Sequence, residues 1–106
     1  MEKIKIKLLR NTSQSPTYGS ETAAGADIYA DISEKLDILP HHTVMVPSGF
    51  AIEIPDGFGG FIYPRSGMAS KRGLAPANKV GVIDSDYRGE IMVSLYNHSS
   101  SVQTIA

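Results

Sequence analysis

The sequence predicts an all-β fold, either a sandwich or a barrel. Short apolar segments with strand-like patterns recur along the 106 residues, and turn-forming Gly, Pro, Asn, Asp and Ser residues separate them at close spacing. Only one segment, near the middle of the chain, has the pattern of a brief helix. A chain of this length supports one modest core, so many short strands and at most one short helix predict a single β domain.

Composition excludes several classes of function. Apolar residues make up 42% and charged residues 20% of the chain, an ordinary globular balance, and the net charge of -1 argues against a general nucleic-acid or anionic-membrane binder. Without cysteine there is no disulfide framework and no thiolate zinc site. No apolar run approaches the length of a membrane span, and residues 1–7 lack the apolar block of a signal peptide. We therefore expect a soluble, cytoplasmic protein.

The N-terminal third begins with a strand. Residues 3–8 alternate lysine with isoleucine or leucine, which predicts a half-buried strand whose lysines blunt a sheet edge. Residues 11–22 are polar and predict a loop. Residues 23–30 are small, apolar and strand-like, and Asp27 interrupts them. This aspartate is either hydrogen-bonded within the core or directed at a cation.

The middle of the chain contains turn signals between short strands. Residues 47–49 (Pro-Ser-Gly) and 55–57 (Pro-Asp-Gly) predict turns. His41 and His42 are neighbours, and neighbouring side chains on extended chain point to opposite faces, so together they chelate a metal poorly. We therefore expect both histidines in a surface loop. The strands predicted on either side of these features cover residues 36–39, 44–46, 50–54 and 60–63.

A helical segment follows at residues 64–73. Ser66 is a plausible N-cap, residues 67–72 predict one or two helical turns, and Gly73 is expected to end them. Free N–H groups at a helix start, the Ser66 hydroxyl and the adjacent Arg65 form a pocket suited to an anion. The alternative is an ordinary capped turn with no ligand.

Residues 78–90 predict the tip of a β-hairpin between a strand over 80–83 and a second strand over 90–96. The tip presents the carboxylate of Asp84 and the ring of Tyr87 beside exposed backbone. Main-chain N–H and C=O groups there can recognise a flat polar ring, the tyrosine can stack on a sugar, and the carboxylate can hold a water. The alternative is that Asp84 and the aspartate two residues later only shape a turn.

The last six residues, 101–106, begin another strand that stops without a turn, a partner or a polar tail. A strand of this kind indicates either that the chain is a piece of a longer one or that the strand pairs with another subunit.

Three stretches together resemble one family, the trimeric dUTP pyrophosphatases (dUTPases). They are residues 24–29 (Ala-Gly-Ala-Asp-Ile-Tyr), 64–69 (Pro-Arg-Ser-Gly-Met-Ala) and 78–90, with Gly-Val-Ile-Asp-Ser-Asp-Tyr-Arg-Gly as its centre. They occur in the family's order, and the resemblance covers essentially the whole chain. The family's fourth motif, Arg-x-Ala-Gln, and its glycine-rich C-terminal arm are not among the 106 residues. We expect residues 1–106 to form a single dUTPase-like β domain that lacks the C-terminal strands and arm.

The resemblance implies a jelly-roll-like β-sandwich that assembles as a homotrimer with active sites at the subunit interfaces. It implies hydrolysis of dUTP to dUMP and pyrophosphate with Mg²⁺ as cofactor, which limits uracil incorporation into DNA and supplies dUMP for thymidylate synthesis. A catalytically silent relative that binds nucleotide or a protein partner is the alternative. A generic β-sandwich binding module is a third reading.

The resemblance also assigns roles to residues of the third stretch and beyond it. Asp84 would act as the base that prepares water for attack on the α-phosphorus, which suits a carboxylate within hydrogen-bond reach of that water. Tyr87 would pack under the deoxyribose and exclude a 2′-hydroxyl. The uracil pocket would be formed by Asn78, Gly81, Val82, Ile83 and Met92.

The first two stretches would hold the phosphates and the metal. Arg65, Ser66 and Gly67 would bind phosphate oxygens through charge, hydroxyl and backbone N–H, because phosphoryl transfer depends mostly on positioning and charge neutralisation. Asp27 would contact Mg²⁺ through water or brace the arginine side of the site. Mg²⁺ usually keeps several of its waters, so a single carboxylate acting through water is chemically sufficient.

Overall fold

The structure, a computed structural model, describes residues 3–106 and has eight strands and one short helix in that range. The all-β prediction is confirmed. The first two residues, which belong to the segment examined for a signal peptide, lie outside the described part. The elements are β1 (Lys5–Leu8), β2 (Leu36–Ile38), β3 (Thr43–Glu53), β4 (Gly60–Ile62), α1 (Ser66–Arg72), β5 (Leu74–Pro76), β6 (Gly81–Ile83), β7 (Glu90–Asn97) and β8 (Gln103–Ile105).

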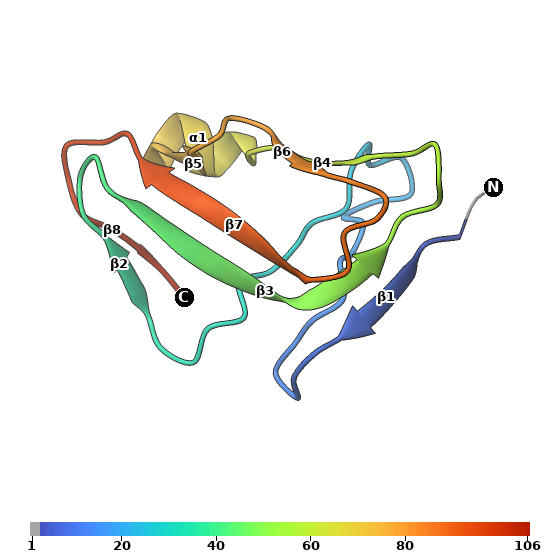
Figure 1. The fold of residues 1–106 in the computed structure, drawn as a ribbon. Helices are drawn as coiled ribbons and strands as arrows, with labels where there is room; N and C mark the ends of the chain where they lie inside the picture. The colour runs from blue at the N-terminus through green and yellow to red at the C-terminus, as the bar shows by residue number, and fades with distance from the viewer. Residues whose placement is uncertain (1–2) are drawn as a thin grey trace.

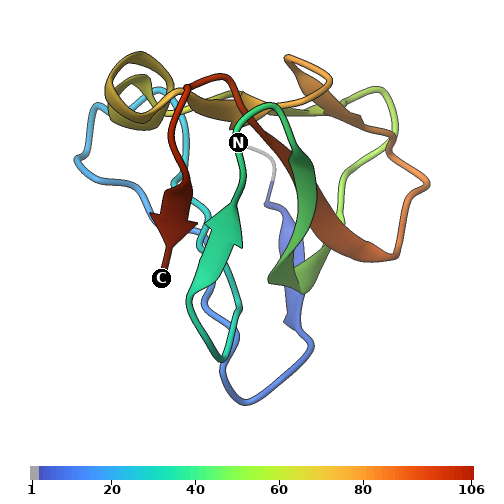
Figure 2. The ribbon, with the colours of Figure 1, turned by 90° about the vertical axis from the view of Figure 1, so that its left-hand side faces the viewer.

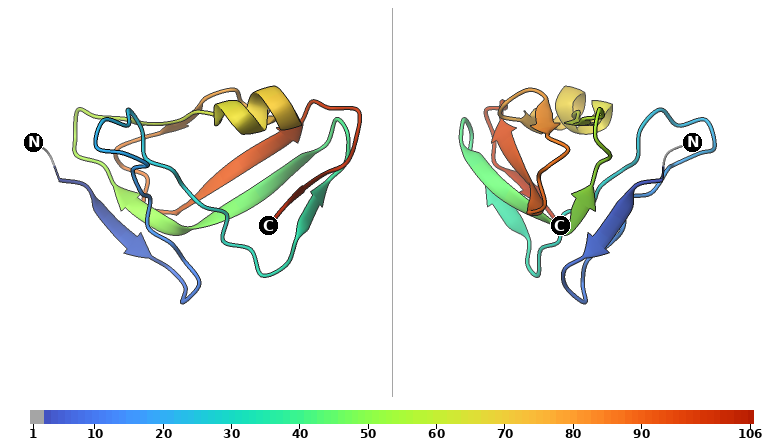
Figure 3. Two further views of the ribbon diagram at one scale, coloured as in Figure 1. Left: turned by 180° about the vertical axis from the view of Figure 1, so that it is seen from behind. Right: turned by 45° about the vertical axis from the view of Figure 1, so that its right-hand side comes forward.

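The strands form one four-stranded antiparallel sheet and two small ribbons (Figure 1). The sheet has the order β1-β3-β7-β5, and the ribbons are β2-β8 and β4-β6. Figure 2 shows β2 and β8 side by side in front of the long sheet strands. The strand β8 therefore has a partner within its own chain. Seen from behind, β1 and β8 lie at opposite ends of the molecule (Figure 3).

The core lies between the β2-β8 ribbon and the sheet. Its buried centre joins residues from four strands, Ile38, Val46, Leu74 and Ile105, and Met68 of α1 packs against them. Alternation places these side chains on inner faces, so each short strand contributes one or two residues to a shared apolar contact. Within residues 3–106 no helix has the length and apolar character needed to cross a membrane.

The region around Pro47 differs from the prediction of two separate strands. The chain forms a single strand, β3, whose pairing with β7 shifts register between Pro47 and Ala51. Gly49 adopts a φ of 80° there, and the Ser48 hydroxyl donates a hydrogen bond of 2.6 Å to the carbonyl of Ile91. The turn-forming residues produce a β-bulge that bends the strand, because the sheet partner on each side keeps the chain in the ladder.

The predicted hairpin at residues 78–90 is wrong. β6 pairs with β4, whereas β7 pairs with β3 and β5. The segment 84–89 therefore connects one ribbon to the main sheet. A hairpin needs a short loop that turns a strand back onto its neighbour, and the six residues here are long enough to carry the chain into a different sheet.

Two other predictions need correction, and three are confirmed. β1 is an edge strand as predicted, but the prediction that it is half-buried is wrong. Ile6 and Leu8 are 37% and 48% exposed, because pairing with β3 leaves the apolar face of β1 uncovered. Residues 23–30 form no named strand, and only Asp27 makes an isolated bridge, to Thr17. The short strand at 36–39, the turn at 55–57 and the exposed loop position of both histidines are confirmed.

Candidate functional site

The start of α1 presents the residues predicted to bind phosphate. Arg65 is the N-cap, with φ -76° and ψ 141°, and its side chain makes no capping hydrogen bond. Ser66 is the first helical residue, so its prediction as the N-cap is wrong by one position. Gly73 ends the helix in the left-handed conformation, with φ 68°, as predicted. Ser66 and Gly67 are exposed, and a Cβ added at Gly67 would meet nothing within 4 Å.

Asp27 lies beside this helix start. Its carboxylate is 3.9 Å from Nε of Arg65, and the two side chains are 40% and 72% exposed. Two backbone hydrogen bonds between Asp27 and Thr17, of 2.6 and 3.0 Å, fix the loop that carries the carboxylate. Such a solvated ion pair contributes little to stability. Asp27 is therefore not a core aspartate, and its position matches the expectation that it braces the arginine.

The donor set for a metal is sparse in the part of the chain that the structure describes. No group of three or more His, Cys, Asp or Glu side chains converges there. Asp27 is half-buried, oxygen-bearing and adjacent to an arginine suited to phosphate. One carboxylate of this kind fits Mg²⁺ that arrives on a triphosphate and keeps its waters.

A groove of about 270 Å³ lies beneath the helix start. Apolar side chains of the sheet, the helix and the loop before it dominate its lining, which includes Tyr29, Arg65, Met68, Leu74, Leu95 and Ile105. Arg65 is the one predicted site residue among those that line it. The groove therefore borders the residues predicted to bind phosphate, and Asp84, the predicted catalytic base, does not line it.

The β4-β6 ribbon carries the backbone predicted to bind uracil. Its register pairs Ile62 with Gly81 and Gly60 with Ile83. A Cβ at Gly81 would lie 3.4 Å from Ile62 and 3.7 Å from the Asn78 amide nitrogen, so both neighbours lie close to the backbone there. Val82 is 66% exposed. The amide of Asn78 and the backbone of β6 thus lie together, as the uracil prediction requires.

Asp84 and Tyr87 lie in the turn that follows β6. The Tyr87 N–H donates to the Asp84 carbonyl at 3.1 Å, and the Asp84 side chain is exposed. The Tyr87 ring folds back over Gly89, where an added Cβ would lie 2.6 Å from the phenol oxygen. The Tyr87 hydroxyl donates to the carbonyl of Glu90 at 2.8 Å. The turn therefore has an accessible carboxylate next to a ring in a defined position.

Met92 lies on a different element from the other residues predicted for the uracil pocket. The sheet register places it on β7 opposite Pro47 of β3, and its side chain is 39% exposed. The β4-β6 ribbon, which carries Gly81, is a separate pair of strands. Within one chain, its place in the pocket stays a prediction.

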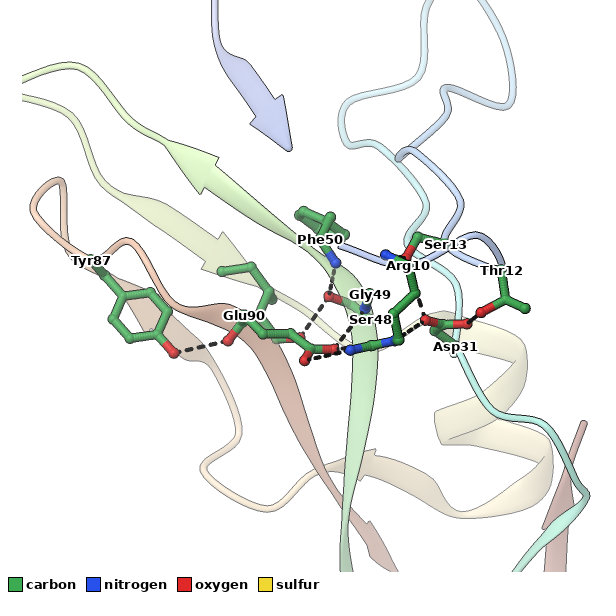
Figure 4. Close-up of polar contacts among 10 residues, drawn as sticks. Arg10, Thr12, Ser13, Asp31, Ser48, Gly49, Phe50, Tyr87 and Glu90 are labelled. Carbon is green, nitrogen blue, oxygen red and sulfur yellow. Dashed lines mark hydrogen bonds and ion pairs between the residues drawn. The ribbon is translucent and has the colours of Figure 1, made fainter. Parts of the chain in front are cut away.

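A polar cluster next to this turn was missed from the sequence. The Arg10 guanidinium lies between two carboxylates (Figure 4), donating to Asp31 at 2.7 Å and to both carboxylate oxygens of Glu90, one of them at 3.1 Å. We call these three residues the Arg10 cluster. Asp31 also accepts from the Thr12 hydroxyl at 2.6 Å, and Glu90 accepts from the Gly49 N–H at 2.9 Å.

The cluster shifts the pKa of all three groups toward the charged form. Hydrogen bonds from Thr12 and then Arg10 lower the pKa of Asp31. Hydrogen bonds from Arg10 and then the Gly49 N–H lower the pKa of Glu90, and the two carboxylates raise the pKa of Arg10, Glu90 more than Asp31. The members are up to 80 residues apart in sequence, so no local pattern connects them. The one local signal in the sequence was a charged residue, Glu90, at the start of the strand predicted over residues 90–96.

The predicted site residues fall into two groups within one chain. Arg65 follows the Ile62 end of the ribbon, and Asp84 follows the Ile83 end, which pairs with Gly60. The phosphate group is Asp27, Arg65, Ser66 and Gly67, and the uridine group is Asn78, Gly81, Val82, Ile83, Asp84 and Tyr87. The chain leaves two antiparallel strands at opposite ends, so Arg65 and Asp84 follow opposite ends of the ribbon.

The fold and these groups define a class of protein: an all-β domain with a helix start predicted to bind an anion and a separate turn with an exposed carboxylate and a tyrosine, groups that suit a nucleotide. Comparison with known proteins identifies the family. The dUTPase family model matches residues 11–106, and the chain belongs to the dUTPase family.

Two curated relatives and one solved structure illustrate the match. The chain is 50% identical over 101 residues to a deoxyuridine 5'-triphosphate nucleotidohydrolase of Desulfitobacterium hafniense, covering 92% of this chain and 67% of the relative. It is 44% identical over 104 residues to the same enzyme of Polynucleobacter asymbioticus, covering 95% and 70%. The dUTPase of Staphylococcus aureus phage phi11 superposes with a TM-score of 0.84 at 28% identity, covering 92% of this chain and 61% of the phage chain. The fold is therefore the jelly-roll-like fold of dUTPases.

Proposed function

We propose that this chain hydrolyses dUTP to dUMP and pyrophosphate, which keeps uracil out of DNA and supplies dUMP for thymidylate synthesis. The observation that carries the proposal is the turn after β6. An exposed carboxylate, Asp84, lies three residues from a tyrosine whose hydroxyl is bonded to the Glu90 carbonyl at 2.8 Å. The backbone of Gly81–Ile83 and the Asn78 amide precede this turn. A base and a sugar-binding ring thus lie next to polar groups that can hold a pyrimidine.

In the proposed reaction, Asp84 accepts a proton from a water that attacks the α-phosphorus. Its exposure allows a water to reach it, and a carboxylate needs only to lie within hydrogen-bond distance of that water. The ring of Tyr87 packs under the deoxyribose and leaves no space for a 2′-hydroxyl. Asn78 has both a donor and an acceptor for the uracil edge, and Gly81, Val82 and Ile83 supply main-chain contacts. Met92 completes the pocket.

The triphosphate binds at the start of α1 in this proposal. Arg65 contributes charge, Ser66 a hydroxyl, and Gly67 a backbone N–H with open space in front of it. Asp27 would hold Mg²⁺ through water and keeps Arg65 directed at the phosphates. When bound, Mg²⁺ neutralises charge on the phosphate oxygens. A solved structure of a variant of the phi11 phage dUTPase concerns the coordination of a structural Mg(II) ion.

We further propose that the active site forms between chains of a homotrimer. The division of the site residues into two groups supports this, because the uridine group of one chain needs a phosphate group placed opposite Asp84. Exposed apolar side chains on the β4-β6 ribbon also support assembly. Phe61 and Val82, which pair across the ribbon, are 58% and 66% exposed. We place the protein in the cytoplasm, where deoxynucleotides are made.

The test is release of pyrophosphate from dUTP, dCTP, dTTP and UTP with Mg²⁺. Release from dUTP alone supports the proposal. Asp84→Asn is expected to lower turnover by at least a hundredfold while nucleotide affinity changes less than threefold, since general-base catalysis contributes about 10²–10⁴-fold. Asp86→Asn is the matched control in the same turn. Binding of dUTP without turnover would support a silent, nucleotide-binding relative, and wild-type turnover by Asp84→Asn would disprove the assignment of the base.

A further inference from the structure

The position of the Tyr87 ring is set from two sides. The ring occupies the space that a side chain at Gly89 would take, because a Cβ there would lie 2.6 Å from the phenol oxygen and 2.8 Å from the ring carbon that carries it. The hydroxyl is bonded to the carbonyl of Glu90. The ring is nevertheless 45% exposed, so its place depends on these local contacts more than on core packing. Whatever fixes Glu90 therefore also fixes the ring.

Glu90 is fixed by its carboxylate at the bulge of β3. The register shift between Pro47 and Ala51 takes the Gly49 N–H out of the ladder, and the Glu90 carboxylate accepts it at 2.9 Å. Gly49 itself cannot be replaced without strain, since its φ is 80° and a Cβ would lie 2.6 Å from a carboxylate oxygen of Asp31. Glu90 is thereby attached to a rigid point of the sheet, at the first residue of β7.

Arg10 completes the attachment. It donates two hydrogen bonds to the Glu90 carboxylate and one to Asp31, whose side chain is only 5% exposed. The Arg10 side chain is 44% exposed, and a long exposed arginine loses conformational freedom when it is held. The bidentate geometry toward Glu90 and the second carboxylate offset that loss. Arg10 is thus an oriented guanidinium that holds Glu90, the residue directly after the turn that carries Asp84 and Tyr87.

We propose that Arg10 and Glu90 are positioning residues that set the selectivity of the site for deoxyribose over ribose by holding the Tyr87 ring. This inference rests on the proposed function, in which Tyr87 excludes the 2′-hydroxyl. Arg10 touches no nucleotide in the proposal; it acts through Glu90. Loss of Arg10 frees the Glu90 carbonyl to shift, and a ring that shifts with it leaves space for the hydroxyl of ribose.

The test measures affinity for the non-hydrolysable imido analogues of dUTP and UTP by calorimetry, with Mg²⁺. The readout is the dissociation constant for the UTP analogue divided by that for the dUTP analogue. A general loss of stability weakens binding of both analogues equally and leaves this ratio unchanged. Arg10→Met is expected to lower the ratio on the order of tenfold, less than the ~100-fold that a misplacement of 1 Å can cost in catalysis. Arg10→Lys, which keeps the charge but not the fork, should lie between Arg10→Met and the parent.

Two further variants separate positioning from general stability. Arg72→Met is the matched control: Arg72 bonds to Gln103 at 3.5 Å and to the Thr104 carbonyl at the other end of the molecule, so its loss should leave the ratio unchanged. Tyr87→Phe removes the hydroxyl that reaches Glu90. When Arg10→Met is added to Tyr87→Phe, the ratio should fall by less than a further twofold. Both substitutions break the same series of contacts, from Arg10 through Glu90 to the Tyr87 ring.

The outcomes distinguish this inference from the proposed function. A parent protein that binds neither analogue, or binds both equally, overturns the proposed function and this inference with it. A parent that prefers the deoxy analogue, with the same preference in Arg10→Met and Arg10→Lys, overturns this inference alone. Additive effects of Arg10→Met and Tyr87→Phe also overturn it, because they would show that Arg10 acts by another route.

Discussion

Replacing Gly89 with alanine tests whether the structure holds the Tyr87 ring where the site needs it. The added Cβ would lie 2.6 Å from the Tyr87 phenol oxygen and 2.8 Å from Cζ, well inside the distance that real Cβ atoms keep. The atoms it meets are the far end of a side chain, which can rotate away. The clash should therefore displace the ring and leave the backbone in place.

The expected cost to the fold is small. Displacing the ring breaks the hydrogen bond from Tyr87 to the Glu90 carbonyl, and a bond of this kind contributes about 0.5–1.5 kcal/mol net. Replacing glycine by alanine also restricts the unfolded chain, which stabilises the protein by ~0.4–1 kcal/mol where the backbone angles allow it. The two effects nearly cancel, so the free energy of unfolding should change by less than about 1 kcal/mol.

The expected cost to the site is larger. A displaced Tyr87 ring no longer packs under a deoxyribose, and affinity for the imido analogue of dUTP should weaken by roughly tenfold, equivalent to ~1.4 kcal/mol. Urea unfolding followed by circular dichroism gives the stability, and calorimetry gives the affinity. Ser100→Ala is the control, because this exposed residue lies outside the three stretches assigned to the nucleotide and the metal. Unchanged affinity in Gly89→Ala, or a loss of stability above about 3 kcal/mol, would refute the reasoning.

Two further outcomes follow from buried and charged contacts. Asn97→Ala should lower the free energy of unfolding by about 3–4 kcal/mol, because the fully buried amide makes four hydrogen bonds at ~1 kcal/mol each. Ser100→Ala, in the exposed turn that follows β7, should change it by less than about 0.5 kcal/mol in urea unfolding. The lowered pKa values of Asp31 and Glu90 should stabilise the fold fully above their ordinary values of 3.8 and 4.5 and progressively less as pH falls from there through the lower folded values. Arg10→Met should flatten this acid limb in unfolding measured across pH 2–7, and an unchanged limb would contradict the cluster's role.

Local sequence patterns predicted much of the fold. The alternation in residues 3–8 identified an edge strand, and Gly73 identified the helix end, because each depends on the backbone preferences of adjacent residues. The ordered stretches at 24–29, 64–69 and 78–90 identified the family. The Pro-Ser-Gly sequence at 47–49 predicts a turn between two strands, because proline and glycine are typical of both turns and bulges. Only the pairing with β7 on each side of these residues identifies the bulge.

Sequence alone determined the class of fold, the family and the chemical types available for a nucleotide site, since these depend on periodicity, turn residues and motif order. Tertiary structure decided which strands pair, so that β6 joins β4 while β7 enters the main sheet. It also decided that Arg10 meets Glu90 across 80 residues of chain. Contacts between distant residues depend on the balance of packing and chain entropy over the whole domain, and no short stretch of sequence contains that balance.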